Sequence, residues 1–202
     1  MKKRKIKRGK RKSKNVRTLF SENKTFILGG NSAGLQNKKE SFQRNISLFK
    51  PAVYFIQESK LSKKGKIVID DYAIFELIRY NTGGGGLLTA VHKSLNPVNV
   101  SEEVNDEEIL VVEATFGNRK IRLINGYGPQ ESENEEKRKN FYSRLDYEIK
   151  RAKLSGSLIC IEMDSNAKLG PRLIPNDPHP QFGNGKLLQN IIYHNNLKVV
   201  NG

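Results

Sequence analysis

The sequence is typical of an α/β (α+β) protein in which two mixed β-sheets pack against each other and helices lie outside them. Short runs of β-branched and apolar residues recur along the chain, whereas only three segments space their apolar residues as a helix does. Several of these runs follow one another with no helix between them. The chain therefore lacks the regular strand and helix alternation of a doubly wound parallel sheet.

The strands are expected where apolar residues run or alternate between turn residues. They cover residues 25–30, 52–58, 66–80 (as one strand or two), 87–95, 108–116, 119–127, 157–164 and, at the start of a final strand, 197–201. The "GNR" that begins at Gly117 has the residues and the length of a hairpin turn.

The three helices are expected at residues 37–49, 132–154 and 186–195. The first has Phe42, Ile46 and Phe49 at helical spacing, and Ser132 is placed to cap the second. The third puts its apolar residues on one face, namely Leu187, Leu188, Ile191 and Ile192.

A basic tail, residues 1–24, precedes a single domain of residues 25–202. Eleven Lys and Arg residues come before the first acid, Glu22, and supply most of the net charge of +15. The cations expected to bind nucleic acid are Lys2, Lys3, Arg4, Lys5, Lys7, Arg8, Lys10, Arg11 and Lys12. Such a block repels itself and buries no apolar surface, so we expect it to be disordered until it meets an anion. Nucleic acid, with DNA preferred, and nuclear import receptors rank above a membrane surface as its partner. A solvated, solubilising arm is an equal alternative.

Composition excludes several classes of protein. No apolar run approaches the roughly 20 residues that span a bilayer, and the basic N-terminus has no apolar stretch behind it, as a secretory signal would have. The one cysteine, Cys160, excludes an internal disulfide framework. We expect an intracellular protein, nuclear or otherwise.

Polar residues of one kind follow several of the expected strands. They are Asn31, Glu58, Tyr127, Asp164 and Asn166. Residues two apart on a strand point the same way, so Asp164 and Asn166 are expected to share a side. If the strand ends meet at one edge, crowded carboxylates need a cation between them. This set of oxygen donors suits Mg²⁺ or Mn²⁺ rather than zinc.

Four segments in this order, "GNSAGL", "IQESKL", "GYGPQ" and "MDSNAKLG", resemble the endonuclease/exonuclease/phosphatase superfamily, whose members include DNase I. The nearest likeness is to the endonuclease domains of non-LTR retrotransposons, and it covers residues 25–202. The resemblance implies a DNase I-like four-layer sandwich and metal-dependent hydrolysis of a phosphodiester, with DNA as the expected substrate.

The resemblance also implies a role for each residue. Glu58 would be the principal metal ligand, and Asn31 would support the metal or the attacked phosphate. Asp164 would orient and help deprotonate the attacking water. Asn166 would hold a phosphate oxygen, and Tyr127 would donate a hydrogen bond to the phosphate.

The chain departs from the family pattern at three points. Ala33 stands where nuclease members often carry an acid or amide, and Met163 stands where glycine usually precedes the aspartate. The family ends with a later Asp and a Ser-Asp-His element, which do not follow here, so the domain is expected to be truncated at its C-terminus. None of His92, His179 and His194 takes the place of that histidine by position.

Three interpretations remain open from the sequence. The first is a Mg²⁺-dependent DNA endonuclease of a retroelement-like protein. The second is a truncated, inactive copy that binds nucleic acid through its tail. The third is a phosphatase of the same fold that acts on another phosphoester.

Overall fold

Two four-stranded sheets form the centre of the molecule. A computed structural model of the chain describes residues 26–61, 67–79, 85–101, 108–171, 173–174 and 178–200. The basic cations of residues 2–12 lie outside these ranges. The first sheet has the order β1-β2-β4-β3 and is built from β1 (Ile27–Asn31), β2 (Val53–Gln57), β3 (Tyr72–Leu77) and β4 (Leu87–His92). The second has the order β5-β6-β7-β8 and is built from β5 (Val98–Asn99), β6 (Ile109–Phe116), β7 (Arg119–Tyr127) and β8 (Leu158–Asp164).

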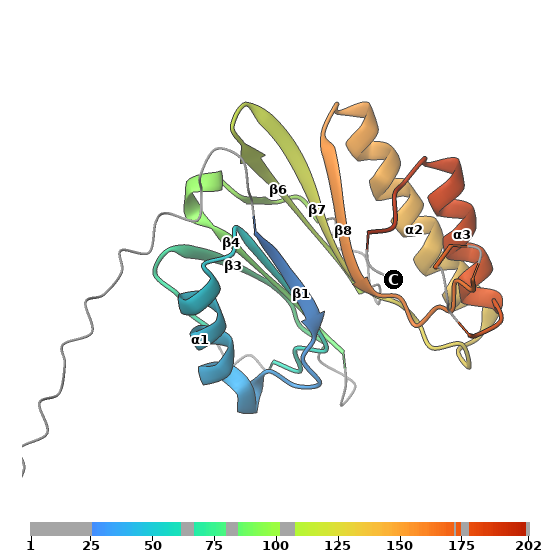
Figure 1. The fold of residues 1–202 in the computed structure, drawn as a ribbon, viewed down its shortest axis with the longest axis horizontal. Helices are drawn as coiled ribbons and strands as arrows, with labels where there is room; N and C mark the ends of the chain where they lie inside the picture. Colours follow the sequence, from blue (N-terminus) through green and yellow to red (C-terminus); the bar gives the residue numbers. More distant parts are fainter. Residues whose placement is uncertain are drawn as a thin grey trace, which may run out of the picture.

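Helices cover the outer face of each sheet (Figure 1). The helical elements are η1 (Gln36–Lys38), α1 (Lys39–Phe49), η2 (Lys93–Leu95), α2 (Glu135–Leu154) and α3 (Gly183–His194). The helix α1 lies on the first sheet, while α2 and α3 lie on the second. The layers therefore run helix, sheet, sheet, helix, as in the DNase I-like sandwich, and two mixed sheets flanked by helices are confirmed.

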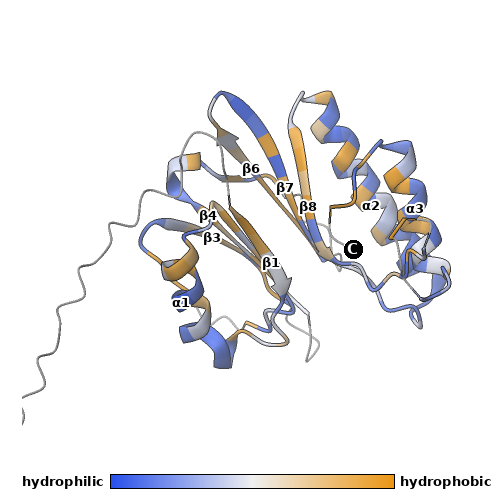
Figure 2. Cartoon of the chain, in the orientation of Figure 1, coloured by the Kyte–Doolittle hydropathy of each residue, from blue (hydrophilic) through white to orange (hydrophobic). Residues whose placement is uncertain are grey.

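Three apolar clusters hold the layers together. Phe42 and Ile46 of α1 pack on the first sheet, and Phe141, Leu145 and Ile149 of α2 pack with α3 on the second. A third cluster fills the space between the sheets with side chains such as Phe55, Val112 and Leu123. Figure 2 shows the same pattern, with apolar strands inside and helices that carry hydrophilic residues on their outer sides. Each Å² of apolar surface that is buried stabilises the packed layers by roughly 25 cal/mol.

The mixed character of the sheets decides where the polar residues lie. The strands β1 and β2 are parallel, with Asn31 opposite Gln57. The strands β7 and β8 are also parallel, with Tyr127 opposite Asp164. Because the carboxyl ends of parallel strands meet at one edge, each pair delivers its last residues to the same end of its sheet. The contacts between β1 and β8 and between β2 and β7 bring these two ends together.

Several local predictions are confirmed and two are wrong. The hairpin is confirmed, because Phe116 pairs with Arg119 across Gly117, whose φ is +61°. Within residues 66–80, the described residues form one strand, Tyr72–Leu77. The residues before it, 67–71, carry no strand assignment. The cap of α2 is Asn134 rather than Ser132, since the Asn134 side chain accepts a hydrogen bond from Lys137 N. Asn134 lies directly before the first helical residue, where a capping side chain reaches the free N–H groups.

The expected final strand at residues 197–201 is also wrong over the residues described there. Residues 197–200 carry no strand assignment. A run such as "LKVV" has the side chains of a strand, but a strand forms only where a neighbour supplies hydrogen-bond partners, and no described strand lies beside it. Among the described residues, no helix is both long and apolar enough to cross a bilayer.

Candidate active site

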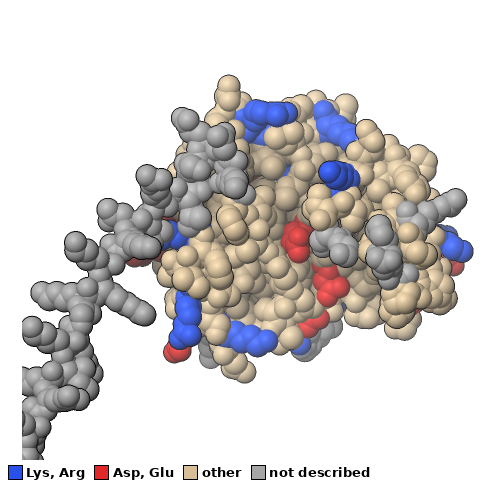
Figure 3. All heavy atoms as spheres, in the orientation of Figure 1, with Lys and Arg blue, Asp and Glu red and all other residues tan. Residues whose placement is uncertain are grey.

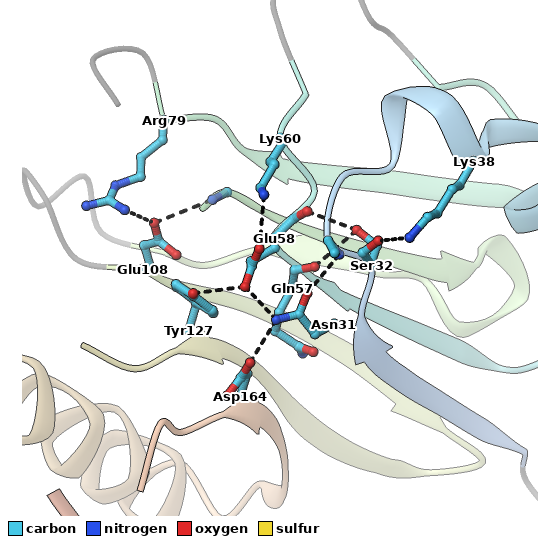
Figure 4. Close-up of polar contacts among 12 residues, drawn as sticks. Asn31, Ser32, Lys38, Gln57, Glu58, Lys60, Arg79, Glu108, Tyr127 and Asp164 are labelled. Carbon is cyan, nitrogen blue, oxygen red and sulfur yellow. Dashed lines mark hydrogen bonds and ion pairs between the residues drawn. The ribbon is translucent and has the colours of Figure 1, made fainter. Parts of the chain in front are cut away.

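Side chains from four strand ends meet where the two sheets adjoin (Figure 4). Asn31 ends β1, Glu58 follows β2, Tyr127 ends β7 and Asp164 ends β8. These residues come from both sheets, and the structure brings them into direct contact. The grouping expected from the sequence at one edge is therefore what the fold produces.

The amide of Asn31 lies at the centre of this group. Its Nδ2 donates to Glu58 Oε1 at 2.7 Å and to Asp164 Oδ2 at 2.8 Å. The Tyr127 hydroxyl donates to the same Glu58 Oε1 at 2.9 Å. One neutral amide thus separates two carboxylates that would otherwise repel each other.

Asn166 adjoins the group but bonds differently. Its Nδ2 donates to Gly128 O at 2.8 Å, and its backbone N–H donates to Asp164 Oδ1 at 3.3 Å. The loop that follows β8 is held further by Gly128 N, which donates to Asp164 O at 2.7 Å, and by the Tyr142 hydroxyl, which donates to Ser165 O at 3.0 Å. A Cβ on Gly128 would lie 2.5 Å from Ser165 O, so only glycine allows this approach. The contacts fix Asp164 and Asn166 relative to Tyr127.

The backbone of Glu58 is held in an uncommon conformation. Its φ is +48°, in the left-handed region that non-glycine residues seldom adopt. Such a residue costs on the order of 1–3 kcal/mol and persists where its surroundings enforce it. Here Gly34 N donates to Glu58 O at 2.9 Å, and the next residue, Ser59, donates through its N–H to Gly86 O at 2.9 Å. This geometry turns the carboxylate toward Asn31 and Tyr127.

Local contacts set the charges of the group. The hydrogen bond from Asn31 is the largest cause that lowers the pKa of Glu58, with Tyr127 and Lys60 adding to it against the effect of burial. Burial, and then the neighbouring Glu58, raise the pKa of Tyr127. At neutral pH Glu58 is therefore a carboxylate, and Tyr127 keeps the proton that it donates.

The donor set fits a hard divalent cation. Glu58 Oε2 already faces a positive group, the Lys60 ammonium at 3.2 Å, and this carboxylate and that of Asp164 supply oxygen donors. Within the described ranges no three His, Cys, Asp or Glu side chains gather as a complete metal cage. Mg²⁺ needs no such cage, because it is commonly held by one or two carboxylates together with waters and substrate phosphates. Asn31 presents its NH₂ to the carboxylates, while its Oδ1 accepts from Ala33 N at 2.8 Å.

Sequence reasoning missed a buried polar pair directly beneath this group. Gln57 Nε2 donates to Asn125 Oδ1 at 2.8 Å, and Asn125 Nδ2 lies 3.0 Å from Leu88 O and 3.1 Å from Thr89 Oγ1. Both side chains are at most 1% exposed. The pair ties β2 to β7 one residue before Glu58 and two residues before Tyr127. The signal for it was the presence of single amides inside the otherwise apolar runs "VYFIQ" and "RLING".

The surface of this face is charged unevenly. Figure 3 shows acidic side chains gathered along its middle, between β1 and β8, with Lys and Arg toward the rim. His92 ends β4, which runs antiparallel to β2, so it lies at the opposite edge of the sheet from Glu58. His194 ends α3, where its Nδ1 is 2.8 Å from Asn190 O. His92 thus lies at the far end of its sheet from Glu58, and His194 lies at the C-terminal end of α3.

No family model matches the sequence, and no curated protein matches it. Solved structures do match. The endonuclease domain of TRAS1, a telomere-specific non-LTR retrotransposon, is 17% identical with a TM-score of 0.59, over 85% of this chain and 71% of that one. A 3'-5' exonuclease (NExo) from Neisseria meningitidis is 14% identical with a TM-score of 0.62, over 83% and 70%. An AP endonuclease from Archaeoglobus fulgidus is 16% identical with a TM-score of 0.61, over 85% and 71%.

The matched region spans only part of each of these structures. A humanized D. rerio TDP2 also matches, with a TM-score of 0.51, and the matched region covers 65% of that chain. At sequence identities this low, the structural similarity shows the fold alone. The chain has the DNase I-like endonuclease/exonuclease/phosphatase fold that the four segments indicated.

Proposed function

We propose that this chain carries the active site of a DNA nuclease, of the kind found in retroelement endonucleases, and that it hydrolyses a phosphodiester with the help of Mg²⁺ or Mn²⁺. The observation that carries the proposal is the Asn31 amide, which joins Glu58 to Asp164 across the two sheets. A structural ion-pair network would place a cation between the two acids. A neutral donor instead lowers the pKa of Glu58 without cancelling its charge, and it holds the Asp164 carboxylate in place beside it.

Asp164 is proposed as the group that receives the proton of the attacking water. The water oxygen forms a bond to phosphorus, the bond from phosphorus to the departing ester oxygen breaks, and the water's proton passes to Asp164. The departing oxygen takes a proton from solvent. Positioning of the two reacting groups supplies most of the acceleration in such an in-line displacement.

Tyr127 and Asn166 are proposed to hold the phosphate. The Tyr127 hydroxyl is protonated and now donates to Glu58, so a phosphate oxygen at the same place would accept from it. Asn166 lies beside it on the loop after β8. Donors aimed at the oxygens that gain charge stabilise the transition state.

Glu58, supported by Asn31, is the residue that we propose holds the cation. When bound, a divalent ion would offset the charge of the phosphate and polarise it. The lowered pKa of Glu58 suits this role, because the ligand must be ionised. Asn31 would act by orienting Glu58, since its NH₂ faces the carboxylate.

DNA is the substrate that we propose. One matched structure is of the Neisseria NExo, described as a 3' phosphatase, bound to a product DNA hairpin, with a TM-score of 0.59 and 15% identity over 83% of this chain and 70% of that one. The retroelement role is supported by the likeness to the TRAS1 domain. The basic tail adds cations that suit a phosphate backbone.

Nicking of supercoiled plasmid by the full-length protein tests the proposal. With Mg²⁺ present, Glu58→Ala is expected to lower the rate roughly 100-fold or more, since the lost charge compensation amounts to several kcal/mol. Glu135→Ala is the matched control, because Glu135 is an exposed acid at the start of α2 that pairs with Lys139. Undiminished nicking by Glu58→Ala, at an unchanged melting temperature, would show that Glu58 is not the metal ligand.

A further inference from the structure

A partly buried ion pair, formed by Arg79 and Glu108, lies beside the Glu58 and Tyr127 contact and has no part in the roles above. Glu108 precedes β6, and its backbone oxygen accepts from Tyr127 N at 2.9 Å. Its side-chain Oε1 lies 2.9 Å from Arg79 NH1 and accepts from Gly86 N at 3.4 Å (Figure 4). The pair is therefore joined through Tyr127 to the strand that ends at the site.

The neighbouring backbone leaves room for this pair. Gly85 has φ +83°, and a Cβ there would meet Glu108 Oε1 and would lie 2.8 Å from Arg79 Cδ. The same segment carries the contacts that hold Glu58, because Gly85 O accepts from Lys60 N at 3.0 Å. The turn that positions Glu58 thus also accommodates Arg79.

The pair is asymmetric in its exposure. The Glu108 side chain is 6% exposed, whereas the Arg79 side chain is 30% exposed. Burial raises the pKa of Glu108, and the Arg79 charge opposes that rise. Arginine has five N–H donors in a planar fork, and within the described ranges the ion pair engages one of its nitrogens. The acid is the buried anchor, and the guanidinium is its exposed end.

An ion pair of this kind is a poor source of stability. Removing the Glu108 charge from water costs several kcal/mol, which its attraction to the partly exposed Arg79 does little more than offset, so apolar residues of similar size would serve the fold as well. Glu108 Oε2 is also buried without a hydrogen-bond partner among the described residues. The arrangement is better explained by the orientation that it gives to Arg79.

The position of Arg79 suits a phosphate next to the one that is cut. Arg79 follows β3 and Lys60 follows β2, and Lys38 ends the short helix after β1. Figure 4 shows these three cations along one side of the row formed by Tyr127 and Asp164. If a nucleic-acid strand runs along this side of the site, the phosphate that flanks the reacting one meets Arg79.

We propose that Arg79, held in place by Glu108, binds a phosphate of the substrate strand that flanks the scissile one. This inference rests on the proposed function. Glu108 is a positioning residue in it, because it acts through Arg79. A planar fork that is already oriented loses little freedom when it binds a phosphate.

The test couples Arg79 to one phosphate of the substrate. Duplex DNA is prepared with a single uncharged methylphosphonate linkage at successive positions around the cut, and kcat/KM is measured with the full-length protein. We expect Arg79→Ala to lower kcat/KM about 10-fold on unmodified duplex. At one flanking linkage the methylphosphonate should slow the wild type by about the same factor but slow Arg79→Ala less than about 2-fold, because the contact is already lost.

The control is Arg119→Ala, since Arg119 begins β7 at the end away from Tyr127. The double variant R79A/E108Q removes the buried charge that Arg79→Ala would leave unpaired, and it should show the same loss of sensitivity at that linkage. Equal methylphosphonate penalties in the wild type and in both variants at every linkage would overturn the inference. A wild type that cuts none of the duplexes would instead refute the proposed function itself.

Discussion

Asn31 and Asp164 are 133 residues apart in the chain, and Asn31 Nδ2 donates to Asp164 Oδ2 at 2.8 Å. The same nitrogen donates to Glu58, so one amide sets the spacing of both acids. The contact exists because the last residues of β1 and β8 adjoin where the two sheets meet. Substitution of Asn31 should therefore change the environment of both carboxylates.

The first prediction concerns the pH dependence of Asn31→Ala. The hydrogen bond from Asn31 is the largest cause that lowers the pKa of Glu58, so its removal should raise that pKa. Since the ionised form is the active one, activity should be lost at a higher pH than in the wild type as the solution is acidified. The maximal rate should fall roughly 10- to 100-fold, the worth of a hydrogen bond to a charged group.

A pH–rate profile between the acid limit and neutrality checks this expectation. Asn45→Ala is a suitable control, because Asn45 lies on α1 and its Nδ2 contacts the Tyr54 hydroxyl at 3.4 Å. An acid limb that does not move in Asn31→Ala would mean that Glu58 is not the group whose ionisation governs activity.

The second prediction concerns Gly128. A Cβ at this position would lie 2.5 Å from Ser165 O and 2.8 Å from Ser165 C, so Gly128→Ala must displace the loop after β8. Because that loop begins directly after Asp164 and carries Asn166, we expect a loss of activity of about 10-fold or more, since displacement by about 1 Å can cost on the order of 100-fold.

Gly30→Ala is the matched control for that variant. Gly30 lies next to Asn31, has no heavy atom within 4 Å of the position of a Cβ, and should tolerate alanine. Cleavage rates and melting temperatures of the two variants are compared. Retained activity in Gly128→Ala would show that the placement of this loop does not limit the reaction.

The third prediction concerns the buried amide pair beneath the site. Asn125→Leu leaves Gln57 Nε2 without its acceptor and three other buried polar groups without their donor. Each unsatisfied group costs about 1–3 kcal/mol, so the free energy of unfolding should fall by at least about 2 kcal/mol. Urea denaturation followed by circular dichroism measures it.

The double variant Q57L/N125L separates packing from polarity. It removes the stranded Gln57 amide, so it should be no less stable than Asn125→Leu alone. A double variant that loses the sum of both single effects would mean that the two amides do not act as a pair.

The fourth prediction concerns the basic tail. Deletion of residues 1–17 removes eleven Lys and Arg residues. Each lost phosphate contact should flatten the plot of log K against log salt by about 0.9, so duplex binding should weaken without regard to sequence. Fluorescence anisotropy over a range of salt concentrations gives the slope. An unchanged slope would leave the tail with a role in import or solubility.

By itself the sequence determined which residues end the strands and therefore which side chains reach the site. The runs "VYFIQ", "RLINGY" and "LICIEMD" show their strand character locally, since burial and β-branching depend on nearby residues. The polar residue at the end of each run can also be recognised from its neighbours in the sequence. Asn31, Glu58, Tyr127 and Asp164 are thus predicted as a group by the sequence alone.

Only the tertiary structure decided how those residues bond to one another. That Asn31 faces two carboxylates with its NH₂, that Glu108 holds Arg79, and that Gln57 meets Asn125 all depend on the register of strands and the packing of two sheets. The residues of the Gln57 and Asn125 pair are 68 positions apart. No local sequence pattern predicts a contact between residues so far apart in the chain. The length of a side-chain hydrogen bond depends on the whole fold, which must place the two groups to within a few tenths of an ångström.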